Sequence, residues 1–145
     1  MFLGQYTYSL DDKGRITIPS RFRDELLGGL IITRGLDPCL ALYPTDIWKE
    51  IAQKVNALPL TSPQGRALRR LLYADAVDVV PDRQGRVLVP ERLLVYAGLE
   101  SVGEAVVVGL ERYMELWAPQ RWEEEMARQT QMMEDNPALW ENLQI

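Results

Sequence analysis

Two short stretches of the chain place an aspartate four residues before an arginine, with a glycine between them. They are Asp11 and Arg15 in DDKGRITIP, and Asp82 and Arg86 in DRQGRVLVP. An aspartate at the start of a turn can accept hydrogen bonds from backbone amides downstream and can hold a guanidinium by a charge-assisted bond. An arginine held in this way can bind a phosphate, or a guanine edge with two parallel hydrogen bonds. The pattern predicts either an anion-binding loop or an ion pair that only fixes a hairpin.

The two nonapeptides are copies of one phrase, 71 positions apart. Four of the nine positions are identical, and two others exchange Ile for Val. The similarity continues downstream, where CLALYPTDIW at 39–48 aligns with YMELWAPQRW at 113–122. The chain therefore contains an internal repeat of roughly fifty residues, which predicts two similar structural halves.

Each repeat predicts the same order of elements: a hairpin around the Asp-x-x-x-Arg loop, a short helix after the proline, a second hairpin and a longer helix. Ser20 is the expected cap of the first short helix, and Gly28-Gly29 its end. Each half alone is too small to bury an adequate core, so the halves should interlock. The expected division is 1–60 for the first half, 61–75 for a connecting helix, 76–122 for the second half and 123–145 for an acidic C-terminal helix and tail.

The connecting helix should begin with Ser62 as cap and Pro63 at its first position. Its arginines, Arg66, Arg69 and Arg70, form either a solvated face or a DNA contact. The C-terminal helix should end near Asn136-Pro137. Beyond it, the apolar side chains predict either docking on a neighbouring chain or a disordered end.

Composition excludes several classes of function. The chain has 145 residues and no histidine, so neither Ser-His-Asp chemistry nor an imidazole metal ligand is available within it. It also lacks a GxxxxGK[ST] loop and a GxGxxG fingerprint, and its single cysteine, Cys39, should be a small buried residue. No enzyme activity, metal or cofactor is expected. No apolar run is long enough for a membrane span, and the N-terminal segment does not match a secretory signal, so a soluble cytoplasmic protein is expected.

The net charge of −5 hides an uneven distribution. Residues 1–92 contain 13 Lys and Arg against 11 Asp and Glu, whereas residues 93–145 contain 3 against 10. Both Asp-x-x-x-Arg loops lie in the less acidic part, which favours these loops as a contact for nucleic acid. The candidate DNA contacts are Lys13, Arg15, Arg21, Arg23, Arg83 and Arg86. The residues expected to organise the loops are Asp11, Gly14, Asp82 and Gly85.

The first loop is the preferred DNA contact, because Arg21 and Arg23 on the following helix would extend its positive surface. The second loop carries Gln84 where the first carries Lys13. Whether Asp82 and Arg86 contact DNA or serve only as a structural ion pair stays open at this point.

The chain resembles the MraZ family. The resemblance covers about residues 1–130 and is carried by MFLGQY, DDKGRITIPSRFR, PCLALYP, DRQGRVLVP and ELW at the matching places. It implies an α+β fold: a duplicated, pseudo-twofold, swapped-hairpin β barrel of SpoVT/AbrB-like halves, flanked by helices.

The resemblance also implies a function. Members of the family are bacterial DNA-binding transcriptional regulators, typically repressors of the division and cell-wall gene cluster. They form rings, commonly of eight chains, on direct repeats in promoter DNA. This implies a cytoplasmic, nucleoid-associated protein. Two other classes remain: an AbrB-like antitoxin or protein-interaction module whose acidic tail wraps a toxin, and a carboxylate-dependent enzyme using Asp11 or Asp82.

Overall fold

The computed structural model describes residues 1–144 and has an α+β composition, as the sequence predicts. The strands are β1 (Phe2–Ser9), β2 (Arg15–Thr17), β3 (Leu30–Arg34), β4 (Leu40–Pro44), β5 (Val77–Val79), β6 (Arg86–Leu88), β7 (Glu104–Glu111) and β8 (Met114–Trp117). The helices are the 3₁₀ helix η1 (Ser20–Leu26) and the α-helices α1 (Thr45–Asn56), α2 (Pro63–Tyr73), α3 (Glu91–Ala97), α4 (Pro119–Asp135) and α5 (Ala138–Glu141).

The strands form two antiparallel sheets. The larger has six strands in the order β1-β7-β8-β4-β3-β5, and the smaller is a ribbon of β2 and β6. Strands at equivalent places in the two repeats pair with each other: β2 with β6, and β4 with β8. The first strand of each repeat pairs with the other repeat, β1 with β7 and β5 with β3. Strands of one half therefore form backbone hydrogen bonds with strands of the other half.

The predicted hairpin around each Asp-x-x-x-Arg loop is wrong in its strand pairing. β1 pairs along its length with β7, while β2 pairs with β6. Within the first loop, the hairpin is reduced to an isolated bridge between Leu10 and Ile16, the bond from the Asp11 amide to the Arg15 carbonyl (3.1 Å) and the turn bond from the Gly14 amide to the Asp11 carbonyl (3.1 Å). Local sequence pattern identifies these strands, but the equivalent strand of the other repeat supplies the longer partner.

The expected closed barrel is not formed. β1 and β5 are the two edges of the six-stranded sheet, and the remaining short strands, β2 and β6, pair with each other instead of bridging those edges. With three residues each, β2 and β6 are too short to complete a barrel wall.

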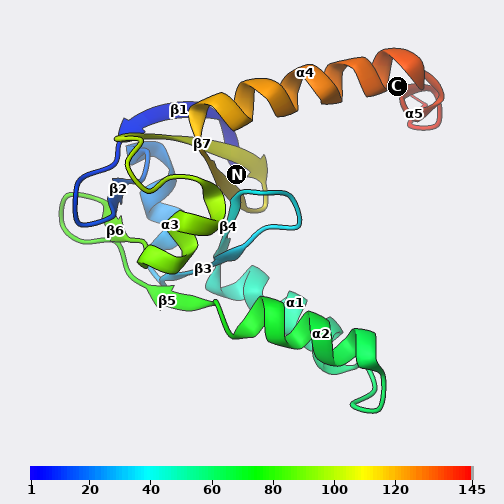
Figure 1. Cartoon of the computed structure of the whole chain (residues 1–145), viewed down its shortest axis with the longest axis horizontal. Coiled ribbons are helices and arrows are strands. Elements are labelled where there is room, and N and C mark those ends of the chain that lie inside the picture. Colours follow the sequence, from blue (N-terminus) through cyan, green and yellow to red (C-terminus); the bar gives the residue numbers. More distant parts are fainter. Residues whose placement is uncertain (145) are drawn as a thin grey trace.

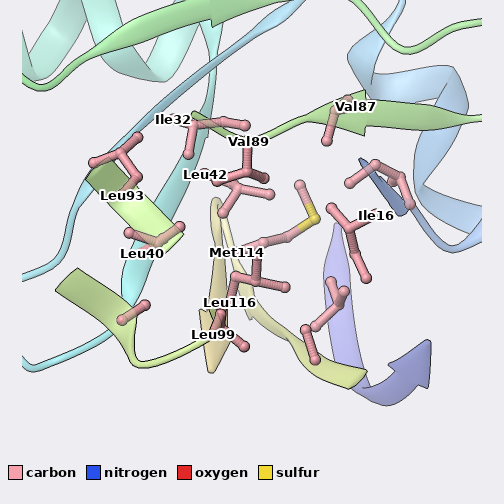
Figure 2. Close-up of a cluster of buried hydrophobic side chains, with 14 of the residues drawn as sticks. Ile16, Ile32, Leu40, Leu42, Val87, Val89, Leu93, Leu99, Met114 and Leu116 are labelled. Atoms are coloured by element: carbon pink, nitrogen blue, oxygen red, sulfur yellow. The ribbon is translucent and has the colours of Figure 1, made fainter. Parts of the chain in front are cut away.

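One hydrophobic core joins the two halves. Figure 2 shows its side chains converging from both repeats, with Ile16 and Val87 from the ribbon near Met114 and Leu42 from the larger sheet. All four are almost fully buried. A smaller cluster contains Cys39, Val106, Val108 and Trp117, with Trp122 from α4 packed against it. Cys39 is a free, buried thiol, as expected.

The helix limits follow capping chemistry. The Ser62 hydroxyl accepts a hydrogen bond from the Gly65 amide (3.1 Å) at the start of α2, so the predicted cap is confirmed. Ser20 is wrong as a cap, because η1 begins after Pro19 and has no side-chain cap bond. α4 ends at Asp135, immediately before the Asn136-Pro137 pair.

The elements are arranged with the ribbon at one end and two helical arms at the other. In Figure 1 the β2-β6 ribbon and its loops lie on the left, while the α1-α2 hairpin and the α4-α5 segment extend to the right. Within residues 1–144, no helix has the length and apolar character needed to cross a membrane.

Candidate nucleic-acid interface

The Asp11 side chain organises the first loop. Its Oδ1 accepts hydrogen bonds from the amides of Lys13 (3.0 Å) and Arg15 (2.8 Å), and its Oδ2 accepts one from Arg15 Nε (2.6 Å). The bond from the Arg15 amide, opposed in part by desolvation, lowers the pKa of the Asp11 carboxyl from its ordinary value of 3.8. The carboxylate therefore fixes both the turn and the direction of the arginine.

The Asp82 side chain builds the second loop in the same way. Its Oδ1 accepts from the amides of Gln84 and Arg86 (both 2.9 Å), and its Oδ2 accepts from Arg86 Nε (3.0 Å). The bond from the Arg86 amide is likewise the main cause that lowers the pKa of Asp82. The repeated sequence thus produces a repeated geometry.

Each loop closes on a glycine in the left-handed region. Gly14 has φ +85° and Gly85 has φ +76°, which side chains rarely adopt. Their surroundings add a second requirement. A Cβ on Gly14 would lie 2.7 Å from the Val89 carbonyl oxygen, and a Cβ on Gly85 would overlap the Arg23 guanidinium. Both loops favour glycine for conformation, and at Gly14 the backbone of Val89 also leaves no space for a side chain.

The ribbon places the two loops at its opposite ends. The Val89 amide donates to the Gly14 carbonyl (2.8 Å), and the Ile18 amide donates to the Gly85 carbonyl (2.7 Å). Four residues along a strand separate Gly14 from Ile18, which corresponds to about 14 Å at the usual rise per residue. This separation is comparable to the width of the DNA major groove, about 12 Å.

The loop arginines keep free donors. Arg15 and Arg86 each use Nε for the aspartate, and among residues 1–144 neither donates an Nη hydrogen bond. Their side chains are 34% and 32% exposed. Lys13 and Arg83 are exposed at the loop tips. Each loop therefore presents one oriented guanidinium beside one mobile cation, a combination suited to phosphate and base edges.

The structure places Arg23 away from the loop it was expected to support. Arg23 donates through Nε to the Ile18 carbonyl (3.1 Å) and packs against Gly85, so it belongs to the second loop. Arg21 donates to the Tyr6 hydroxyl (2.7 Å). The cause is the exchange of strands, which carries the helix after β2 to the loop of the other repeat.

The two loops consequently have different electrostatic surroundings. The second gathers Arg23, Arg83 and Arg86. Beside the first loop is a hollow of about 660 Å³, whose lining includes the carboxylates of Asp12, Glu91 and Glu100. Of the residues on which the preference for the first loop rested, Arg23 therefore lies at the second loop instead.

Two neighbours of the loops were missed from the sequence. Tyr6 holds Arg21, and Leu94 lies against Gly14 as Arg23 lies against Gly85. Leu94 and Arg23 are 71 positions apart, the spacing of the repeat itself. Aligning the helices as well as the loops would have indicated this pair.

Comparison with known proteins agrees with the internal repeat. The family model described as "MraZ protein, putative antitoxin-like" matches the chain twice, over residues 1–71 and 72–139. The chain is 51% identical over 122 residues to a protein of Thermomicrobium roseum named transcriptional regulator MraZ, with 84% of each chain covered. Proteins of the same name from a Roseiflexus species (48% over 123 residues, 85% of each chain) and from Thermus thermophilus (44% over 122 residues, 84% of this chain and 85% of the relative) are also similar.

The fold and the loops together define a class: α+β proteins whose two repeats share a strand ribbon and present one Asp-x-x-x-Arg loop at each of its ends. The chain belongs to the MraZ family.

Proposed function

We propose that this chain is a sequence-specific DNA-binding regulator of transcription and that its two Asp-x-x-x-Arg loops are the DNA contacts. The carrying observation is that Asp11 and Asp82 hold Arg15 and Arg86 in the same orientation at the two ends of one ribbon. The names of the relatives, transcriptional regulator MraZ, support the same function. The proposed role is non-enzymatic.

The cations of the loops would contact two different parts of the DNA. Arg15 and Arg86 have fixed planes and free Nη donors, which suits them to bidentate bonds with a guanine edge. Lys13, Arg83 and Arg23 contribute charge toward phosphates, and Arg21 extends this surface through its bond to Tyr6. The spacing of the loops fits contacts across one major groove. Gly14 and Gly85 keep both loops in shape.

The architecture we propose behind these loops is a duplicated SpoVT/AbrB-like unit with exchanged hairpins and a pseudo-twofold axis. The pairing of β2 with β6 and of β4 with β8 supports it. The division proposed from the repeats has a first half at 1–60, a connecting helix at 61–75, a second half at 76–122 and a C-terminal helix and tail at 123–145.

The biological role we propose is repression of the bacterial division and cell-wall gene cluster, in the cytoplasm at the nucleoid. Several subunits of a ring, of eight chains in the commonest form of the family, would occupy closely spaced direct repeats and block polymerase. One chain with a net charge of −5 offers few phosphate contacts, so assembly is needed for useful affinity.

A second candidate is an antitoxin or protein-interaction module. The description of the matched family as antitoxin-like and the acidic, projecting α4 favour it. A small toxin gene beside this gene, in place of cell-wall genes, would distinguish it from the promoter regulator.

Fluorescence anisotropy with a fragment of the gene's own upstream region tests the loop assignment. Arg15→Ala and Arg86→Ala should each weaken binding by about 1–3 kcal/mol, on the order of tenfold to a hundredfold, with little change in the thermal midpoint. Arg112→Ala is the control, because this arginine pairs with Glu50 (2.7 Å) at the β7-β8 turn. Unchanged affinity in both loop variants would contradict the proposal.

A further inference from the structure

The two helical arms carry exposed apolar side chains at the end of the molecule away from the Asp-x-x-x-Arg loops (Figure 1). One arm is α2 with the loop that precedes it, and the other is α4 with α5. The charges of these two surfaces are opposite, and their shapes are different.

The α4 arm is supported only near its beginning. Trp122 packs against Trp117 (ring centroids 5.6 Å apart) and donates to Gln5 (2.7 Å). Beyond Glu125, the described residues of α4 are exposed except for Gln129 and Met133, which line the hollow facing α5. Short helices without tertiary packing are marginal in water. The outer half of α4 is therefore a segment that a partner would stabilise.

The hollow between α4 and α5 has the chemistry of a helix-binding groove. Its volume is about 390 Å³, and it is lined by Met126, Gln129, Thr130, Met133, Glu134 and Trp140. Met126 is 42% exposed and Trp140 55% exposed. Methionine adapts its shape to a partner, and grooves of this composition accept the apolar face of an amphipathic helix. One carboxylate, Glu134, lines the groove, and residues 123–144 contain six carboxylates and one arginine, so the segment that carries the groove is acidic.

The exposed face of α2 has the complementary chemistry. Leu68 and Leu71 are exposed and three positions apart, so they lie on one face of the helix. Residues 57–74 contain three arginines and no carboxylate. Two of them are fixed by backbone carbonyls: Arg66 donates to Leu60 (2.8 Å), and Arg69 donates to Leu58 (2.5 Å). Arg70 has no such partner within residues 1–144.

We infer that α2 of one copy docks in the α4-α5 groove of a second copy. Leu68 and Leu71 would enter the groove lined by Met126 and Trp140, while the arginines of α2 meet its carboxylates. The contact joins two different surfaces, so it is head-to-tail and repeats from chain to chain, which closes a ring when the rotation per subunit allows. The inference rests on the assembly in the proposed function, for which it supplies the surfaces.

This contact is compatible with DNA binding. The arms and the loops lie at opposite ends of the molecule in Figure 1, so assembly through the arms leaves the loops facing solvent. Covering the exposed leucines and methionines also removes an apolar surface that a free chain would present to water.

Light scattering after size exclusion, without DNA, tests the two surfaces separately. Leu71→Glu should break the α2 face, and Trp140→Glu should break the groove, each reducing the mass of the assembly to that of one chain, 16.6 kDa. Both side chains are at least half exposed, so the substitutions should leave the fold intact, as circular dichroism would verify. Leu36→Glu, at a side chain 98% exposed in the β3-β4 loop, is the control and should assemble as the unaltered protein does.

Mixing the two variants gives the sharpest result. The Leu71→Glu chain keeps an intact groove and the Trp140→Glu chain keeps an intact α2 face, so a mixture should form a dimer of two chains that grows no further. Failure to form this dimer, or unchanged assembly of the single variants, would overturn the inference. The same holds if Arg70→Glu weakens binding to a single DNA box while the mass stays unchanged, because α2 would then face DNA.

The outcome is separable from that of the loop assignment. If the unaltered protein is a monomer, both this inference and the proposed ring are wrong. Binding of a single DNA box by Arg15 and Arg86 would then still be tested independently by the anisotropy experiment. Conversely, loss of DNA binding in every assay would leave the masses and their interpretation unchanged.

Discussion

Asp11 and Asp82 act within their own loops. Both oxygens of each carboxylate accept hydrogen bonds from the loop that follows. The negative charge of an aspartate would repel a phosphate. Here each carboxylate instead accepts a hydrogen bond from Arg15 or Arg86 and so orients that arginine. The contacts of each ion pair are structural, and in the proposed function the pair would act on DNA only through its arginine.

At Gly85, conformation and space can be separated by mutation. Gly85→Ala should destabilise the protein by about 1–2 kcal/mol for the left-handed backbone, with a further loss from the overlap with Arg23. Chemical unfolding at fixed protein concentration measures the free energy. Adding Arg23→Ala should recover the stability lost to the overlap with Arg23 and leave the loss caused by the left-handed backbone.

Gly103→Ala is the matched control for this experiment, since Gly103 has φ +80° and no atom within 4 Å of an added Cβ. It should show the backbone cost alone. Equal losses at Gly85 and Gly103 would mean that Arg23 moves aside freely and does not pack on the second loop.

The helices show which local signals in the sequence decide structure. Ser62 at the start of α2 accepts a bond from Gly65, whereas Ser20 at the start of η1 makes no cap bond. A serine before a helical pattern is thus not sufficient for a cap. The backbone of Pro19, which precedes η1, already sets the direction of entry.

This pair of serines gives a prediction with its own control. Ser62→Ala should lower stability by about 1 kcal/mol, which corresponds to a fall of about 3 °C in Tm, because the Gly65 amide loses its acceptor. Ser20→Ala should change Tm little. Differential scanning calorimetry of both variants makes the comparison, and a similar shift in both would count against the capping role of Ser62.

Much of the element order follows from the sequence, and so do the second hairpins of the two repeats, β3-β4 and β7-β8, but the partners of the strands around the Asp-x-x-x-Arg loops do not. The alternation in RITI and RVLV identifies β2 and β6, and the proline after each marks the start of the next helix. Nothing local in these segments says that Ile16 lies opposite Val87, its equivalent in the other repeat. At these two loops, predicting a hairpin from adjacency therefore assigned the wrong partner strands and, with them, the wrong loop to Arg23. The internal repeat was the one feature of the sequence that could have indicated pairing between equivalent strands of the two halves.

At the scale of the whole molecule, the surface proposed for DNA recognition and the surfaces proposed for assembly lie apart. The loops lie at one end and the helical arms at the other, while the core of both repeats fixes their relation (Figure 1). In the proposed function, an acidic chain would in this way offer the exposed cations of its two loops to DNA. Its net negative charge lies after residue 92, where 10 Asp and Glu stand against 3 Arg, in the part that contains α4 and α5.

Binding to tandem boxes should exceed binding to one box by far more than a factor of two. Linked contacts raise the effective concentration and can increase affinity by about 10²- to 10⁴-fold. Each phosphate contact also adds about 0.9 to the slope of log affinity against log salt, so the two-box fragment should show the steeper slope. Anisotropy across a salt series measures both quantities. Equal affinity for one and for several boxes would contradict the need for assembly.

The pairing of Ile16 with Val87 has an evolutionary consequence. Because equivalent strands of the two repeats lie against each other, a polypeptide with a single repeat could make the same ribbon with an identical copy of itself. Joining two such copies in one gene removes the requirement that both ends of the ribbon be the same. The contrast between a second loop lined by Arg23 and a first loop bordered by carboxylates is the asymmetry that such a fusion permits.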